Sequence, residues 1–120
     1  MLVIAAPALL LLAGSLAAAL FLPHPIPRTA TPAQRLYLTH CASCHGAGGQ
    51  GSWRATLLLI QPGNLADPRI MDSLSDEYLR EVIKRGGAEL GKPGMPAFGF
   101  HLSDEQVQGL VRHLRALGRR

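Results

Sequence analysis

The residues with the clearest chemistry are Cys41, Cys44 and His45, which stand together as Cys41-Ala42-Ser43-Cys44-His45. Cys-x-x-Cys-His is the attachment pattern of a c-type haem, in which two thiols bond the porphyrin and the adjoining imidazole ligates the iron. The chain has 2 cysteines, and both belong to this motif. The pattern predicts one covalently bound haem c, attached through Cys41 and Cys44, with His45 as the proximal iron ligand.

Three other roles for the cysteine pair stay open at this point. The two thiols could form a structural disulfide, or they could act as a thioredoxin-like redox dithiol, which needs a βαβ setting. They could also form half of a zinc site, although the sequence has no second Cys/His pair at ligand spacing to complete a tetrahedron. The contiguous histidine favours haem over all three.

Met95 is the predicted sixth ligand of the iron. It lies in Gly94-Met95-Pro96-Ala97-Phe98, within a stretch rich in Gly and Pro where neither helix nor strand is expected. Proline disfavours helical backbone at the preceding residue, so the Met95 thioether can be presented from a loop. Methionine more often fills gaps in a core, and that role suits Met71, which leads into an amphipathic segment.

With these motifs in this order, residues 31–117 resemble a class I (monohaem, mitochondrial-type) cytochrome c. The order is a helix, the Cys-x-x-Cys-His motif, Pro62-Gly63-Asn64-Leu65, a middle helix, the Met95 motif and a final helix. The resemblance implies an all-α cytochrome c fold, in which three main helices and loops surround one covalently bound haem ligated by His45 and Met95. The details resemble small bacterial cytochromes c and the cytochrome domains of respiratory complexes.

Further haem contacts follow from the resemblance. The Pro62 carbonyl is expected to accept a hydrogen bond from the free ring nitrogen of His45, which would orient the imidazole. Trp53 and Arg54 follow a glycine-rich loop and are candidates to bond a haem propionate. The remaining histidines near these motifs are expected to be solvated rather than to ligate iron, and they are His40, His101 and His113.

Three signals predict where the main helices begin. Thr31-Pro32-Ala33-Gln34 is a capping box with proline at the first helical position, and the helix should run into Cys41. Ser75 should cap the second helix, which Gly86-Gly87 ends, and Ser103 with Gln106 should cap the third. By resemblance, the first and last helices cross, with Leu36 and Tyr37 packing against Leu110, Val111 and Leu114.

The N-terminal residues predict export of the haem domain. Residues 2–22 form an uncharged apolar run that is long enough to cross a bilayer as a helix or to act as a secretory signal. Retention as an anchor is favoured because the run continues past the small residues at 17–19, although no basic residue precedes it. The predicted organisation is an anchor or signal at 1–22, a proline-rich linker at 23–30 and the haem domain at 31–120.

The expected function is one-electron transfer rather than catalysis. An iron held by His and Met has no open coordination position, and the sequence shows no acid/base pair or triad. In the cytochromes this chain resembles, haem is attached outside the cytoplasmic membrane, so we expect a carrier between redox proteins in the periplasm or at the outer face of a bacterial membrane. A net charge of +4 gives no reason to expect nucleic acid as a partner.

Two other functions remain open. The chain could be a permanently bound cytochrome subunit of a respiratory, photosynthetic or dehydrogenase complex. It could instead be a haem sensor or peroxidase, which would require Met95 to be absent from the iron. The basic residues Lys84, Arg85 and Lys92 either steer docking onto an acidic partner or form an ordinary solvated face.

Overall fold

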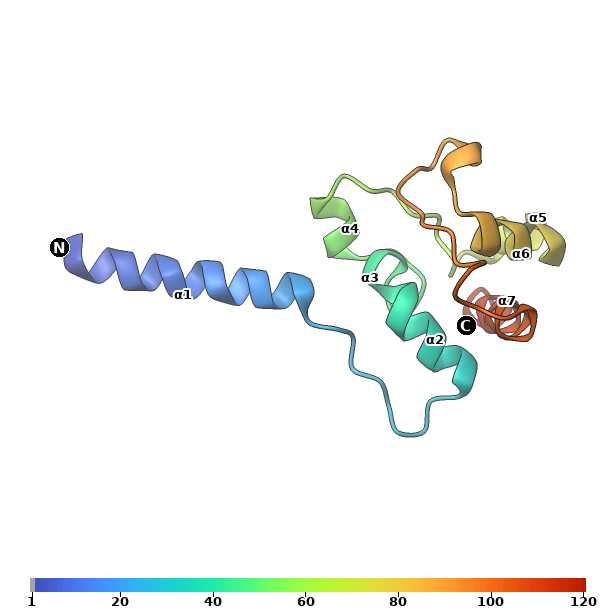
Figure 1. The fold of residues 1–120 in the computed structure, drawn as a ribbon, viewed down its shortest axis with the longest axis horizontal. Coiled ribbons are helices and arrows are strands. Elements are labelled where there is room, and N and C mark those ends of the chain that lie inside the picture. The colour runs from blue at the N-terminus through green and yellow to red at the C-terminus, as the bar shows by residue number, and fades with distance from the viewer. Residues whose placement is uncertain (1) are drawn as a thin grey trace.

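The fold is all-α, as the sequence predicts. The computed structural model describes the backbone of residues 2–120 and the side chains from Ala6 onward, and no β-strand occurs within this part of the chain. The three predicted main helices are present as α2, α6 and α7, and shorter helices that the sequence did not reveal connect them (Figure 1). The elements are α1 (Leu2–Phe21), α2 (Pro32–His40), α3 (Ala42–His45), α4 (Trp53–Leu57), α5 (Pro68–Ser73), α6 (Asp76–Arg85), the 3₁₀ helix η1 (Ala88–Leu90) and α7 (Asp104–Leu117).

All three predicted helix starts are confirmed. The Thr31 hydroxyl accepts a hydrogen bond from the Gln34 amide at 3.2 Å, and the Gln34 side chain accepts one from the Thr31 amide at 2.9 Å. Ser103 heads the same capping box at α7, and Ser75 caps α6. These side chains satisfy amide groups that the first turn of each helix leaves without an intrahelical partner.

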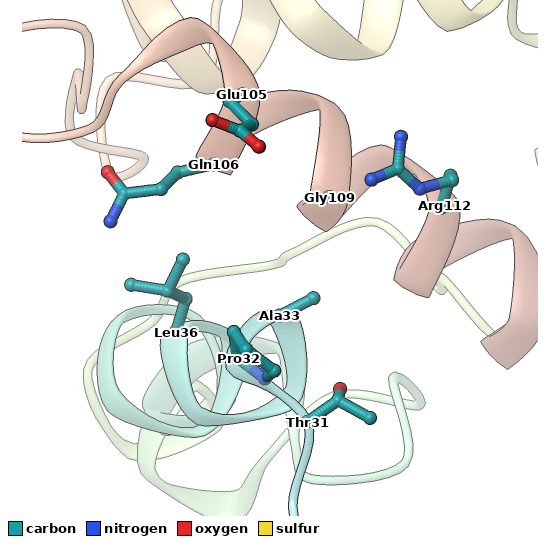
Figure 2. A pocket seen from close by; sticks show the side chains of 8 residues that line it. All are labelled: Thr31, Pro32, Ala33, Leu36, Glu105, Gln106, Gly109 and Arg112. Atoms are coloured by element: carbon teal, nitrogen blue, oxygen red, sulfur yellow. The ribbon is translucent and has the colours of Figure 1, made fainter.

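The predicted crossing of α2 and α7 forms the centre of the core. Tyr37 of α2 is fully buried in one cluster with the apolar stripe of α7, and Leu36 packs at the edge of that cluster. Met71 is 1% exposed within it, which confirms its predicted role as core filler. Figure 2 shows the other side of the crossing, where Ala33 and Leu36 of α2 and Gly109 of α7 line a groove of about 390 Å³.

Arg115 fastens the corner between α5 and α6 to α7. Its guanidinium donates to Asp76 Oδ1 at 2.8 Å, to the Leu74 carbonyl at 2.5 Å and to the Met71 carbonyl. One side chain of α7 therefore satisfies two backbone carbonyls at the end of α5 and holds the start of α6 in place. This fixes the position of α6, which forms one wall of the site described below.

The predicted membrane-spanning helix finds no support in the structure. The N-terminal run does form a helix, α1, which projects away from the other helices (Figure 1). No helix within the described residues is both long enough and apolar enough to span a membrane. Residues 23–30 contain no helix or strand, and Arg54 hydrogen bonds back to the Leu22 carbonyl at 2.8 Å.

Candidate functional site

A cavity of about 710 Å³ lies between the end of α2, α3, α6, α7 and the two segments 59–65 and 87–98. Five of the residues selected from the sequence line it, and they are Cys41, Cys44, His45, Pro62 and Met95. Most of the remaining lining side chains are apolar, which is typical of a cofactor site. The fold therefore brings Met95, which follows α6 in the sequence, to the same cavity as the four residues that precede α6.

The Cys-x-x-Cys-His motif forms a single helical turn. The amides of Cys44 and His45 both donate to the Cys41 carbonyl, at 3.2 and 2.9 Å, so the turn brings both cysteines and the imidazole to the same cavity. The turn ends at Gly46, whose φ of 76° and close approach to the Gly51 backbone leave no room for a side chain. The buried Tyr37 hydroxyl donates to the Gly46 carbonyl at 2.7 Å and fixes this end.

The state of the two cysteines argues against a disulfide and against a redox dithiol. Both thiols are free. Burial, with a further contribution from Cys44, raises the pKa of Cys41 to about 12. Redox-active dithiols have the opposite shift, because the thiolate is the reactive form. The βαβ setting that such a dithiol needs is also missing from the described residues.

The zinc alternative lacks ligands. Among the residues that the structure describes, no group of three or more His, Cys, Asp or Glu side chains could hold a metal ion. A structural zinc site needs four such ligands in a tetrahedron. The pair of cysteines with its histidine therefore fits covalent haem better than a metal site made of protein ligands alone.

The ring of His45 is oriented by Gly63, which corrects the prediction for Pro62. Nδ1 of His45 lies 3.3 Å from the Gly63 carbonyl oxygen, and Pro62 lines the cavity instead. A turn in which Asn64 Oδ1 accepts the Ala66 amide at 3.0 Å sets this register one residue later than expected. With the proton on Nδ1 donated to Gly63, the Nε2 lone pair is left for a metal.

Burial also favours the form of His45 that can bind a metal. It lowers the pKa of the imidazole; the hydrogen bond to Gly63 opposes this effect, and the charge of Lys92 adds to it. A neutral imidazole is the form that ligates a metal. The environment of His45 therefore prepares the ring for coordination.

Met95 is held at the cavity by its backbone. Its amide donates to the Lys92 carbonyl at 3.1 Å, and its carbonyl accepts from the Gly87 amide at 3.0 Å. The segment continues with Phe98 and Gly99, whose amides each donate at 3.0 Å to carbonyls in the last turn of α6. The sequence predicted that Met95 lies in a loop, but it did not reveal this attachment to α6.

The structure does not bring Trp53 and Arg54 to the cavity, and their contact with a haem propionate stays a prediction. Neither residue is part of the cavity lining, and Trp53 is 52% exposed. Ser52 caps α4, and from this helix the Arg54 guanidinium donates to the Leu22 carbonyl at 2.8 Å. Lys92, one of the basic residues that the sequence singled out as a possible docking group at the haem edge, lines the cavity.

The three remaining histidines differ in their surroundings. His40 is exposed, as expected, and it also lines the cavity, with its ring 5.6 Å from that of Phe98. His113 packs against Tyr37 with ring centroids 5.0 Å apart, away from the cavity lining. His101 is exposed and does not line the cavity.

The residues at the cavity fit a haem c. Two free thiols at the attachment spacing, an imidazole with a free Nε2 and a thioether share one largely apolar cavity. A covalently bound porphyrin needs the thiols, its iron needs soft or nitrogen ligands, and its ring needs apolar walls. Each of these requirements is met by residues of this chain.

Comparison with known proteins agrees with this description. Residues 28–114 match the protein family described as "Cytochrome C oxidase, cbb3-type, subunit III". The solved structure of the KustC0563 c-type cytochrome has a TM-score of 0.61 and 32% sequence identity, covering 71% of this chain and 95% of that one.

Two curated relatives carry a similar segment within longer proteins. The dihydro-heme d1 dehydrogenase of Pseudomonas aeruginosa is 34% identical over 85 residues, which is 69% of this chain and 14% of the relative. The gluconate 2-dehydrogenase cytochrome c subunit of Pantoea cypripedii is 34% identical over 90 residues, which is 67% of this chain and 18% of the relative. The chain thus spans less than a fifth of either protein.

Proposed function

This chain belongs to the c-type cytochrome family described as cytochrome c oxidase, cbb3-type, subunit III, and from this premise we propose that it carries single electrons through one haem c. In the proposal, Cys41 and Cys44 bond the haem, and His45 and Met95 are its axial ligands. The observation that carries the proposal is the convergence of these four residues on one apolar cavity.

A bound haem supplies an iron that changes between the ferric and ferrous states by one electron. The chain's own residues hold the group and tune it. Gly63 fixes the imidazole of His45 and raises its basicity through the hydrogen bond to Nδ1. The thioether of Met95 would supply the second protein ligand to the iron, which would leave no position open to oxygen or peroxide and would raise the potential relative to harder ligands.

Partners and location form part of the same proposal. We propose that the haem domain is exported and exchanges electrons with redox proteins at the outer face of a bacterial membrane. Sequencing the N-terminus of protein from the native host separates the two roles of residues 2–22, because a chain that begins near Leu20 has lost a signal. A chain that keeps the whole segment has retained it as an anchor or leader.

Permanent residence in a larger oxidoreductase is the second candidate function. It is favoured by the relatives, one of which is the cytochrome c subunit of a gluconate 2-dehydrogenase. Copurification from native membranes tests it. A stable complex with a dehydrogenase would support the subunit role, and isolation as a free monomer would support the carrier role.

Covalent attachment is tested by acid–acetone extraction. Thioether bonds from Cys41 and Cys44 should keep the haem on the polypeptide, and the mass of the chain should rise by that of one haem. Replacement of both cysteines by alanine is the matched variant, and it should release any bound haem into the solvent. Complete extraction from the wild-type protein would contradict the proposal.

Replacement of Met95 tests the axial ligand. The oxidised protein should show the weak absorption band at the red edge of the visible spectrum that is typical of a thioether–ferric iron bond. Met95→Ala should abolish this band, lower the reduction potential and let cyanide or carbon monoxide bind rapidly. Met71→Leu is the control, because Met71 is buried in the core and does not line the cavity. An unchanged spectrum in Met95→Ala would mean that another side chain holds the iron.

A further inference from the structure

Both backbone hydrogen-bonding groups of Met95 are satisfied, one by Gly87 directly after the end of α6 and the other by Lys92 in the loop that follows η1. The Met95 carbonyl accepts from the Gly87 amide, and the Met95 amide donates to Lys92, whose own amide donates to the Gly87 carbonyl at 2.8 Å. Gly87 therefore hydrogen bonds to two points of the loop that follows η1, Lys92 and Met95.

The contact at Gly87 is too close for a side chain. A Cβ atom added there would lie 2.3 Å from the Lys92 carbonyl oxygen and 3.1 Å from the Met95 Cβ. Gly87 is buried, and its φ of −99° and ψ of −3° are available to any residue. The requirement for glycine at this position is therefore steric rather than conformational.

Gly86 and Gly99 also lie where the segment that carries Met95 packs against the end of α6. A Cβ at Gly86 would lie 2.7 Å from the Met95 carbonyl oxygen, and a Cβ at Gly99 would lie 2.9 Å from the Lys84 carbonyl oxygen. The main chain of the Met95 segment thus packs against the last turn of α6 and the two residues after it, and Gly86, Gly87 and Gly99 each lie at a contact too close for a side chain.

We propose that Gly87 is a positioning residue for axial ligation, which sets the Met95 thioether at the distance the iron requires. The inference rests on the proposed function, because it assumes that Met95 ligates the haem. Gly87 acts through Met95 and Lys92 and touches no reacting atom. Any side chain at position 87 displaces the Met95 backbone and opens the iron to other ligands.

The test is Gly87→Ala in the holoprotein. Its backbone angles permit alanine, so the variant changes only the space beside Lys92 and Met95. We expect covalent haem content to stay at the wild-type level, whereas the thioether–iron band is lost and the reduction potential falls. Because overpacking displaces the Met95 backbone, cyanide binding to the oxidised protein should accelerate about fivefold to 150-fold, which is a cost of about 1–3 kcal/mol converted at 1.4 kcal/mol per factor of ten.

Gly48→Ala is the matched control. Gly48 has no atom within 4 Å of an added Cβ, it does not have a positive φ, and it lies in a loop that does not line the cavity. This variant should keep the band, the potential and the cyanide binding rate of the wild type. Equal effects of the two substitutions would assign the change to a general loss of glycine and overturn the proposal.

A second measurement needs no variant. Hydrogen exchange of the wild-type holoprotein should show protection of the Gly87 and Met95 amides, because they donate to the carbonyls of Met95 and Lys92. Rapid exchange at both amides would overturn the proposal even if Gly87→Ala fails to accumulate.

The outcomes separate the inference from the proposed function. If Met95→Ala leaves the band unchanged, the assignment of Met95 itself has failed. If Met95→Ala removes the band but Gly87→Ala retains it, with wild-type potential and cyanide rate, Met95 is the ligand and only the role of Gly87 is wrong.

Discussion

At the scale of single residues, Tyr37 connects the core to the Cys-x-x-Cys-His turn. Its ring is fully buried between α2 and α7, and its hydroxyl donates to the carbonyl of Gly46, the residue directly after His45. Burial, with a smaller effect of Cys41, raises the pKa of the Tyr37 hydroxyl above its ordinary value, so the group remains a donor at neutral pH. The hydroxyl thus ties the end of the haem motif to the centre of the fold.

We predict that Tyr37→Phe destabilises the protein by about 0.5–1.5 kcal/mol, because the buried Gly46 carbonyl loses the Tyr37 hydroxyl and keeps only the Gly49 amide, at 3.1 Å, as a donor. The measurement is chemical denaturation of the holoprotein. Tyr78→Phe removes the same hydroxyl from a side chain that is 41% exposed and should stay within about 0.5 kcal/mol of the wild type. Equal losses of stability in the two variants would show that the Tyr37 hydrogen bond contributes no more to the free energy of unfolding than the exposed Tyr78 hydroxyl does.

His113 should give the stability a pH dependence of known sign. Burial, with a smaller effect of Arg120, lowers the pKa of His113 below its ordinary 6.5. Between the folded and unfolded pKa values the unfolded chain binds more protons, so the free energy of unfolding falls as the pH drops below about 6.5. Denaturation at a series of pH values should show a weaker fall in His113→Gln, whereas the exposed His101→Gln should follow the wild type. A steeper fall in His113→Gln would contradict the sign.

At the scale of elements, the crossing of α2 and α7 depends on how closely the two helices approach. Gly109 lies inside α7, opposite Ala33 of α2 (Figure 2). A Cβ added at Gly109 would lie 3.7 Å from the Ala33 Cβ, which is an ordinary van der Waals contact. Glycine in the interior of a helix costs about 0.5–1 kcal/mol relative to alanine.

Gly109→Ala should therefore stabilise the protein by about 0.5–1 kcal/mol, since it removes the entropic penalty and makes a normal contact. Gly109→Leu should destabilise it, because the larger side chain would push α2 away from α7. Thermal and denaturant unfolding of both variants measure these effects. A loss of stability in Gly109→Ala would mean that the two helices are closer than the structure describes.

Local signals made the main elements predictable, and long-range contacts explain what was missed. Thr31, Ser75 and Ser103 cap helices through residues only three positions away, so sequence alone locates those helix starts. Gly87 and Met95 are eight positions apart and meet only because the loop folds back on α6. Arg54 follows the glycine-rich loop, but the direction of its side chain depends on α4, so its hydrogen bond to the Leu22 carbonyl could not be predicted from the sequence.

The error at Pro62 has a similar origin. A hydrogen bond from His45 to the Pro62-Gly63 region was predictable, but the register within the turn depends on the Asn64 side chain and on the Gly49 carbonyl, which accepts the Leu65 amide at 2.8 Å. Such a register is a tertiary property. The cavity that joins His45 to Met95 is tertiary as well, and the resemblance supplied an expectation of it that the residues alone could not.

At the scale of the whole molecule, the part of α1 described with side chains lies outside the hydrophobic core. In the part of the chain described with side chains, the members of the hydrophobic core all come from Leu36 onward. Arg54 and Arg35 hydrogen bond to backbone carbonyls between Leu22 and Ala30, and these contacts are largely solvent-exposed. The linker is therefore attached to the domain without contributing to its core.

A chain lacking residues 1–22, exported by a substitute signal, should keep its covalent haem, its spectrum and its reduction potential. The loss of the exposed Arg54 hydrogen bond should change the free energy of unfolding by about 1 kcal/mol or less. Denaturation and redox titration of the two proteins provide the comparison. A shortened protein that fails to bind haem, despite successful export, would show that α1 takes part in folding.

The orientation of His45 by a main-chain oxygen has a consequence for how the protein tolerates mutation. Every amino acid at position 63 offers the same carbonyl, and an added Cβ there meets no atom within 4 Å. The imidazole partner can therefore not be deleted by changing the residue that supplies it. The sensitive position is instead Asn64, because its side chain accepts the Ala66 amide and its loss would shift the Gly63 carbonyl. Substitution of Gly63 should therefore preserve the hydrogen bond to His45, whereas substitution of Asn64 should disturb it.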